Sequence, residues 1–146
     1  MTITAEQAAK FVCQKNNWEL TNLKLQKILY IANMIYFGKH EEPLIKESFE
    51  AWDYGPVIPS LYHKVKMFGK DPIENVFHYT PDVKERSKEY ETLKRAAEYL
   101  GQFTAGQLVN ITHKDDGAWY NKYQPGVKGI EIGKEDIQSE YEAHKK

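Results

Sequence analysis

Residues 21–38 read T-N-L-K-L-Q-K-I-L-Y-I-A-N-M-I-Y-F-G. An apolar stripe at helical spacing runs along this stretch, formed by Leu25, Ile28, Leu29, Ala32, Ile35 and Tyr36. Most of the remaining surface is apolar too, through Leu23, Tyr30, Ile31, Met34 and Phe37. Because a helix that is apolar on most sides is a buried one, this stretch is predicted to be the central helix of the fold. Thr21 suits its N-cap, and Gly38 suits its C-terminal stop.

Four polar residues interrupt this apolar stretch, namely Lys24, Gln26, Lys27 and Asn33. A polar group that is buried without a hydrogen-bond partner costs free energy. Each of these side chains is therefore expected either to reach solvent or to find a partner in a neighbouring segment.

The composition describes one soluble, cytoplasmic domain that spans residues 1–146. Its apolar fraction of 41% and aromatic fraction of 13% are typical of a globular chain rather than a disordered one. Cys13 is the only cysteine, which excludes a disulfide framework and a cysteine-based zinc site. The sequence has no run of 18 apolar residues and no signal peptide, so no membrane partner is expected.

The charge balance bears on nucleic acid as a partner. Twenty basic and 21 acidic residues give a net charge of −1, which argues against a dedicated nucleic-acid binder but is compatible with a local basic patch. Two predicted helices, residues 4–15 and 21–38, follow each other across a short turn, as in a helix-turn-helix. A recognition helix keeps a polar, basic face for the major groove, and the second helix here is apolar nearly all round. A nucleic-acid-binding transcriptional regulator is therefore the alternative, and nucleic acid an unfavoured partner.

The predicted fold class is mainly α, with six or seven helices around residues 21–38 and a small two- or three-stranded β element. The first helix opens with a capping box between Thr4 and Gln7. The other helices are expected from Pro59 to Gly69, from Thr80 or Asp82 to Gly101, after Thr104, after Asp115 or Asp116, and over 134–146. The strands are expected at 49–54 and 76–79, with Ile130 and Ile132 as a further edge.

Two local patterns have consequences for packing. The strand at 49–54 is predicted to end in a tight turn, Tyr54-Gly55-Pro56, because Pro56 biases Gly55 away from the helical region. The long helix before Gly101 carries a narrow apolar stripe among charged residues: Val83, Arg86, Tyr90, Leu93, Ala97 and Leu100. Such a stripe packs either on the outside of its own domain or on another protein's helix, and the pattern leaves both open.

The residues with catalytic potential do not form a recognisable set. His63 or His113 would need Ser60 or Cys13 as a nearby nucleophile and a carboxylate to orient the ring, and no spacing indicates this. Asp115-Asp116 is a candidate metal pair, although adjacent carboxylates at a helix start more often cap the helix. No glycine-rich phosphate loop is present. The sequence therefore predicts a protein that is not an enzyme and has no cofactor or metal, and an uncharacterised hydrolase ranks third.

Aromatic residues are concentrated around these motifs: Trp52, Tyr54, Tyr62, Trp119, Tyr120 and Tyr123. One interpretation is that they fill the core, which suits the tryptophans best. The other is that some of the tyrosines, with His63 and His113, line a groove for a protein partner. Tyrosine and tryptophan dominate interface energetics, because they bury a large area at a small cost in conformational entropy.

Three blocks of residues together resemble the SocA-like (Panacea) antitoxin domain family, also described as phage-associated. The blocks are Thr21 with Leu25-Gln26-Lys27 and Tyr30; E-A-W-D-Y-G-P-V-I-P from Glu50 to Pro59 with Tyr62; and Leu108-Val109, Thr112-His113 and Trp119. The resemblance extends from about residue 5 to residue 140, and its most specific part is the Trp-x-Tyr-Gly-Pro-Val block. Many family members carry an additional DNA-binding or toxin-specific segment, which is not expected in this chain.

The resemblance implies an antitoxin that binds a cognate toxin protein directly and blocks it. Some family members also resemble proteolytic adaptors, so a AAA+ protease is implied as a second partner. The residues predicted to contact a partner lie around the turn, the helix after it and the third block: Tyr54, Gly55, Pro56, Tyr62, His63, Lys66, His113 and Trp119.

Overall fold

The computed structural model describes residues 2–114, 117–127 and 129–145. Seven α-helices, one 3-10 helix and one two-stranded sheet occupy this part of the chain, which confirms the mainly α fold class. In chain order the elements are α1 (Ala5–Lys15), α2 (Asn22–His40), β1 (Glu50–Trp52), β2 (Gly55–Val57), α3 (Pro59–Val65), η1 (Lys66–Phe68), α4 (Lys88–Leu100), α5 (Ala105–Thr112), α6 (Ala118–Lys122) and α7 (Lys134–Lys145).

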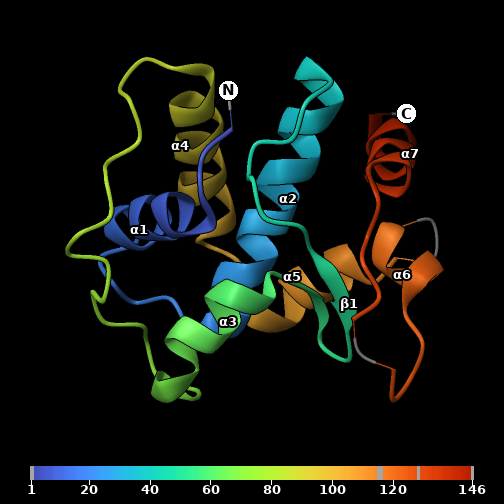
Figure 1. The fold of residues 1–146 in the computed structure, drawn as a ribbon, viewed down its shortest axis with the longest axis horizontal. Coiled ribbons are helices and arrows are strands. Elements are labelled where there is room, and N and C mark those ends of the chain that lie inside the picture. The colour runs from blue at the N-terminus through green and yellow to red at the C-terminus, as the bar shows by residue number, and fades with distance from the viewer. Residues whose placement is uncertain (1, 115–116, 128, 146) are drawn as a thin grey trace.

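Helix α2 runs through the middle of the molecule, and the other elements pack around it (Figure 1). It contacts α1, α3, α4, α5, α7 and β2. Leu25, Ile28 and Leu29 are fully buried, as the apolar stripe predicted. Thr21 is the N-cap, and its hydroxyl oxygen accepts a hydrogen bond from the backbone N–H of Lys24 at 3.3 Å. The predicted central helix is therefore confirmed.

The predicted end of this helix is wrong. Helix α2 continues past Gly38 to His40 and ends at Glu41, which has a left-handed φ of 57°. Gly38 lies inside the helix beneath α7, where a Cβ atom would overlap the ring of Tyr141. The glycine therefore allows α7 to approach α2 closely, and it does not terminate the helix.

The polar side chains of α2 find partners in the segments around it. The Asn33 side-chain oxygen accepts hydrogen bonds from the backbone N–H groups of Leu44 and Ile45 at 2.9 and 3.1 Å. The Gln26 side-chain oxygen accepts one from the backbone N–H of Ile58 at 2.9 Å. These bonds fix the loop after α2 and the end of the β-hairpin directly to the central helix.

The β element is an antiparallel hairpin in which Glu50 pairs with Val57 and Trp52 pairs with Gly55. The turn is formed by residues 53–54, so the predicted turn at 54–56 is wrong, and Gly55 and Pro56 belong to β2. A proline is compatible with a two-stranded sheet, because one side of each strand makes no ladder hydrogen bonds.

A third segment joins the outer side of β1, as the glycine-flanked isoleucines predicted. The backbone N–H of Ala51 donates to the Ile130 carbonyl at 2.9 Å, and the N–H of Ile132 donates to the Phe49 carbonyl at 2.8 Å. The pairing amounts to one isolated antiparallel bridge rather than a full strand.

The segment before α4 differs from the prediction. Residues 76–79 form no strand; residues 72–77 are irregular, and the side chains of Ile73 and Phe77 are buried in the core. Helix α4 begins only at Lys88, because Ser87 caps it rather than Thr80 or Asp82.

The apolar stripe of α4 is correspondingly shorter than predicted. Arg86 lies outside the helix, is exposed and has a φ of 65°, a left-handed conformation that does not continue a right-handed helix. Leu93, Ala97 and Leu100 are buried, and α4 contacts α1 and α2. This part of the stripe packs within the chain, so it is not free to meet another protein's helix.

The last helices cover the other side of α2. Thr104 caps α5, as predicted, and the structure adds a capping box with Gln107. Gly117 occupies the N-cap position of α6, and the predicted caps Asp115 and Asp116 lie outside the described residues. Helix α7 packs along α2. None of the helices in the described ranges combines the length and the apolar character needed to cross a membrane.

Candidate partner-binding site at the β-hairpin

Three aromatic rings hold the β-hairpin from the side of α5 and α6, next to which it lies (Figure 1). The His113 ring stacks on Trp119 with ring centroids 3.7 Å apart, and Trp119 stacks on Tyr123 at 4.6 Å. The indole N–H of Trp119 donates to the Trp52 carbonyl at 2.7 Å, and the Tyr123 hydroxyl donates to the Asp53 carboxylate at 2.6 Å. The rings therefore hold both the strand and the turn in position.

Lys27 holds the hairpin from the side of α2. Its side chain is fully buried, and its Nζ donates to the Pro56 carbonyl at 3.2 Å. Gly55 has a φ of +115°, and a Cβ there would lie 2.6 Å from Cε of Lys27 and 2.9 Å from Nε2 of His113. The absence of a side chain at Gly55 therefore lets Lys27 and His113 lie directly against the hairpin backbone.

Burial governs the protonation of both groups. It lowers the pKa of Lys27 to about 7, because an ammonium loses its hydration in the interior. Burial also holds the pKa of His113 below its usual range, an effect opposed by the Tyr54 backbone and reinforced by the neighbouring Lys27. The Nε2 atom of His113 is buried and has no hydrogen-bond partner among the described residues. Near neutral pH a substantial fraction of the Lys27 side chains is therefore uncharged where they contact the hairpin backbone.

Cys13, one of the two candidate nucleophiles, does not have the properties of a reactive thiol. Cys13 is buried in α1, and burial raises the pKa of its thiol to about 12, so it stays protonated near neutral pH. No three histidine, cysteine, aspartate or glutamate side chains in the described ranges lie close enough to hold a metal. The contacts described above hold the backbone of the β-hairpin in position.

Half of the predicted partner-binding residues form the support of the hairpin rather than its outer surface: Gly55, Pro56, His113 and Trp119. Gly55, Pro56 and Trp119 are buried, and His113 is half-buried. Their contacts are with the hairpin and with each other. Their effect on a partner would therefore be indirect, through the position of the turn.

The other half lies at the surface. Tyr54, at the tip of the turn, is 73% exposed, and His63 and Lys66 are exposed on α3 and η1. Tyr62 is half-buried, because its ring meets Trp52 edge to face at 4.9 Å. The ring of His63 lies 5.6 Å from that of Tyr62, so α3 continues the surface that begins at the hairpin.

Sequence reasoning did not select Lys27, Asp53 and Tyr123 as site residues. A lysine in an otherwise apolar helix was the available signal for Lys27, because its charge had to be satisfied or suppressed. Asp53 and Tyr123 are 70 positions apart and meet only in the folded chain, so no spacing could have revealed their hydrogen bond.

Lys27 should make stability depend on pH. Its pKa is lower in the folded chain than in the unfolded chain, so unfolding takes up a proton between these two values and stability rises with pH. Between pH 7 and pH 8.5 the free energy of unfolding should rise by about 1–2 kcal/mol. Denaturant melts of the wild type and of Lys27→Met measure this, and the rise should vanish in the variant. Equal slopes in the two proteins would contradict the burial of the ammonium.

The fold and the site together define a mainly helical domain that presents a rigid hairpin turn beside a short helix. The chain belongs to the antitoxin SocA-like, Panacea domain family, which it matches over residues 25–120. That range is narrower than the resemblance noted in the sequence, and it contains Lys27, the hairpin, His113 and Trp119.

Comparison with curated proteins finds a similar protein from Caulobacter vibrioides (strain NA1000 / CB15N), Antitoxin SocA. The two are 30% identical over 109 residues, which cover 68% of this chain and 58% of the relative. The chain therefore spans less than two thirds of the length of the curated relative that it matches. No solved structure matches the chain significantly.

Proposed function

We propose that this protein is an antitoxin that acts in the cytoplasm and neutralises a cognate toxin protein by binding it directly. Membership of the antitoxin SocA-like family and the similarity to Antitoxin SocA support this role. In this proposal residues 1–146 act as a single domain. Inhibition is stoichiometric, because the antitoxin covers the working surface of the toxin and makes no covalent bond.

The observation that carries the proposal is the presentation of Tyr54. Its side chain is 73% exposed, while both neighbours are fixed: Asp53 by the Tyr123 hydroxyl at 2.6 Å, and Gly55 between Lys27 and His113. An exposed aromatic side chain on a rigid turn loses little conformational freedom when it binds. Such a residue is a suitable anchor for a protein partner.

The exposed residues of α3 and η1 extend this anchor into a surface, and they provide the test. His63→Glu with Lys66→Glu should leave the melting temperature near that of the wild type, since surface changes usually stay within about 0.5 kcal/mol. Rescue of growth from the toxin encoded by the neighbouring gene should weaken, because misplaced charge at an interface costs several kcal/mol. Co-purification of the two proteins gives an independent measure of the same loss.

A matched control comes from His78→Glu with Lys84→Glu, an exposed histidine and lysine in the segment between η1 and α4. This double variant should rescue growth like the wild type. Full rescue by the His63 and Lys66 variant would move the interface elsewhere. If no neighbouring gene product binds the wild type, while generic duplex DNA binds with a steep salt dependence, the regulator interpretation replaces the antitoxin one.

The proposal includes a second step in which the antitoxin delivers the bound toxin to a AAA+ protease. In that case the half-life of the toxin in cells should shorten when the antitoxin is co-expressed. Deletion of the protease should restore the toxin level without abolishing co-purification. A toxin that is neutralised but not degraded would leave direct binding in place and remove the adaptor step.

A further inference from the structure

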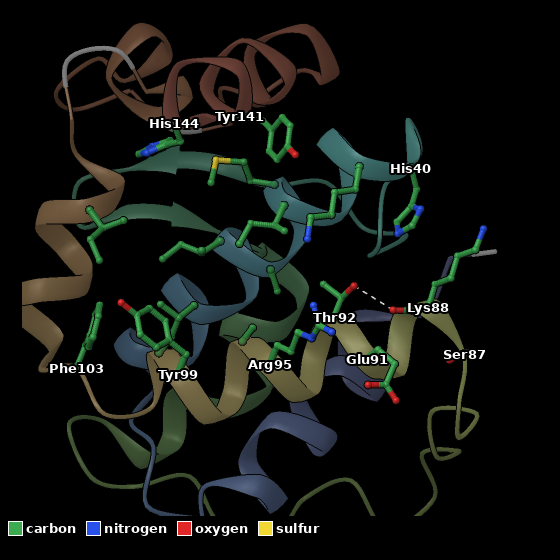
Figure 2. A pocket seen from close by; sticks show the side chains of 18 of the residues that line it. His40, Ser87, Lys88, Glu91, Thr92, Arg95, Tyr99, Phe103, Tyr141 and His144 are labelled. Carbon is green, nitrogen blue, oxygen red and sulfur yellow. Dashed lines mark hydrogen bonds between the residues drawn. The ribbon is translucent and has the colours of Figure 1, made fainter. Parts of the chain in front are cut away.

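A second surface feature is formed by other side chains of α2 together with α4 and α7. It is a groove of about 840 Å³ between α4 and α7, with α2 as its floor and Phe103 and Ile111 at one end. Figure 2 shows Arg95 and Tyr99 on the α4 wall, with Tyr141 and His144 on the facing α7 wall. None of the residues singled out at the hairpin lines it.

The groove carries a strong excess of positive charge. Among its described lining residues the permanent cations are Lys39, Arg86, Lys88 and Arg95, whereas Glu91 is the carboxylate. His40 and His144 line the groove as well. The chain as a whole has a net charge of −1, so this concentration of cations is local. It favours an anionic occupant with more than one negative charge.

The other half of the groove is apolar and aromatic. Ile31 and Ile35 line the floor, and Tyr99 is 63% exposed beside Phe103, with the rings edge to face at 5.1 Å. Exposed aromatic rings over an apolar floor are the side-chain types that supply binding energy at protein interfaces. The occupant should therefore also present apolar side chains.

The length of the groove along α4 corresponds to a short helix. Lys88 and Tyr99 mark its cationic and aromatic ends on α4, and the eleven-residue separation corresponds to about 16 Å, or three helical turns. Arg95 lies between them, so this wall carries two cations and one carboxylate, Glu91. A fatty acid would supply one carboxylate for four permanent cations, whereas a helix can place several carboxylates along one side.

We propose that this groove binds an amphipathic helix of a partner protein, with apolar residues facing Ile31, Ile35 and Tyr99 and acidic residues facing Arg95 and Lys88. The proposal does not rest on the antitoxin role, because it follows from the charge and shape of the groove alone. Recognition is of the helix-in-groove kind, in which residues at positions i, i+4 and i+7 anchor the helix.

The test uses the full chain and a stapled helical peptide of about three turns, with leucine or phenylalanine at i, i+4 and i+7 and three glutamates beside them. Fluorescence anisotropy should detect binding, and a peptide with lysines in place of the glutamates should bind at least about tenfold more weakly. Binding of the acidic peptide should also weaken as salt is raised, because partly exposed charges are screened. A scrambled peptide that breaks the apolar spacing should not bind.

Two variants locate the binding to the groove. Lys88→Glu with Arg95→Glu should weaken the acidic peptide by about tenfold or more, and Tyr99→Ala by about tenfold. Lys94→Glu is the control: it reverses one charge on α4, half the change of the double variant, at a position outside the groove lining, and binding should stay within about threefold. A loss of binding is attributed to the groove only where the variant keeps the wild-type melting temperature.

Four results would overturn the proposal. The protein could bind the scrambled or the basic peptide as tightly as the acidic one, or the variant Lys88→Glu with Arg95→Glu could bind the acidic peptide as tightly as the wild type does. The protein could also bind laurate but not the peptide, or it could self-associate in a way that Arg95→Glu abolishes. The last two would assign the groove to a small amphiphile or to a second copy of this chain. The toxin-rescue assay is unaffected by any of these outcomes, so the two proposals fail separately.

Discussion

Leu29→Ala should lower the free energy of unfolding by about 2–5 kcal/mol, measured by denaturant melts. Leu29 is fully buried in α2, the helix that contacts five other helices and β2. Truncation removes buried apolar surface and leaves a cavity that the surrounding helices fill only in part, because interiors are closely packed. The cost should lie toward the upper end, since side chains from several elements would have to shift together to close the cavity.

Two controls separate the cavity from other effects of substitution. Leu29→Met conserves volume and should cost less than about 1.5 kcal/mol. Lys39→Ala changes an exposed position of the same helix and should stay within about 0.5 kcal/mol. If Leu29→Ala melts like the wild type, α2 is not the centre of the core.

Gly55→Val should also destabilise by about 2–5 kcal/mol, because two costs add. A valine would have to adopt a φ of +115°, which a β-branched side chain strongly disfavours. Its Cβ would lie 2.6 Å from Cε of Lys27, which is buried, and 2.9 Å from Nε2 of His113, which is stacked on Trp119. Relief requires movement of the hairpin away from α2, and thermal melts would report it.

Gly126→Val isolates the backbone part of this cost. Gly126 also has a positive φ, +76°, but a Cβ there would have no neighbour within 4 Å. The variant should therefore cost only the backbone strain, about 1–2 kcal/mol. Equal losses at the two positions would show that Lys27 and His113 do not approach Gly55 as closely as described.

Much of the candidate site was visible in the sequence as separate blocks. The W-D-Y-G-P block, Lys27 and the His113 to Trp119 block were each apparent, and the hairpin brings them together. Which of these residues support the hairpin from inside and which face solvent was not apparent. Whether His113 or Tyr54 faces solvent depends on which elements pack on the hairpin, and local spacing carries no information on that.

Errors at element ends have a common physical origin. Glycine is a residue that often ends a helix, yet α2 continues through Gly38. The missing Cβ leaves room for the ring of Tyr141 from α7, which packs on α2 at this point. Asp82 is a good capping residue, yet α4 begins after Ser87, because Arg86 takes up a left-handed conformation. In both cases the local sequence offered more than one possible helix end, and contacts with distant segments determined which one forms.

The sequence by itself determined the central helix, because the apolar periodicity of residues 21–38 leaves no other way to remove those side chains from water. It also determined the capping box at Thr4 and the cap at Thr104, which depend on residues three positions apart. Only the tertiary structure decided the support of the hairpin and the cationic groove. Lys27, Gly55 and His113 are distant in sequence, and Lys39 of α2 is distant from Lys88 and Arg95 of α4. They come together because α4, α5 and β2 all pack on α2.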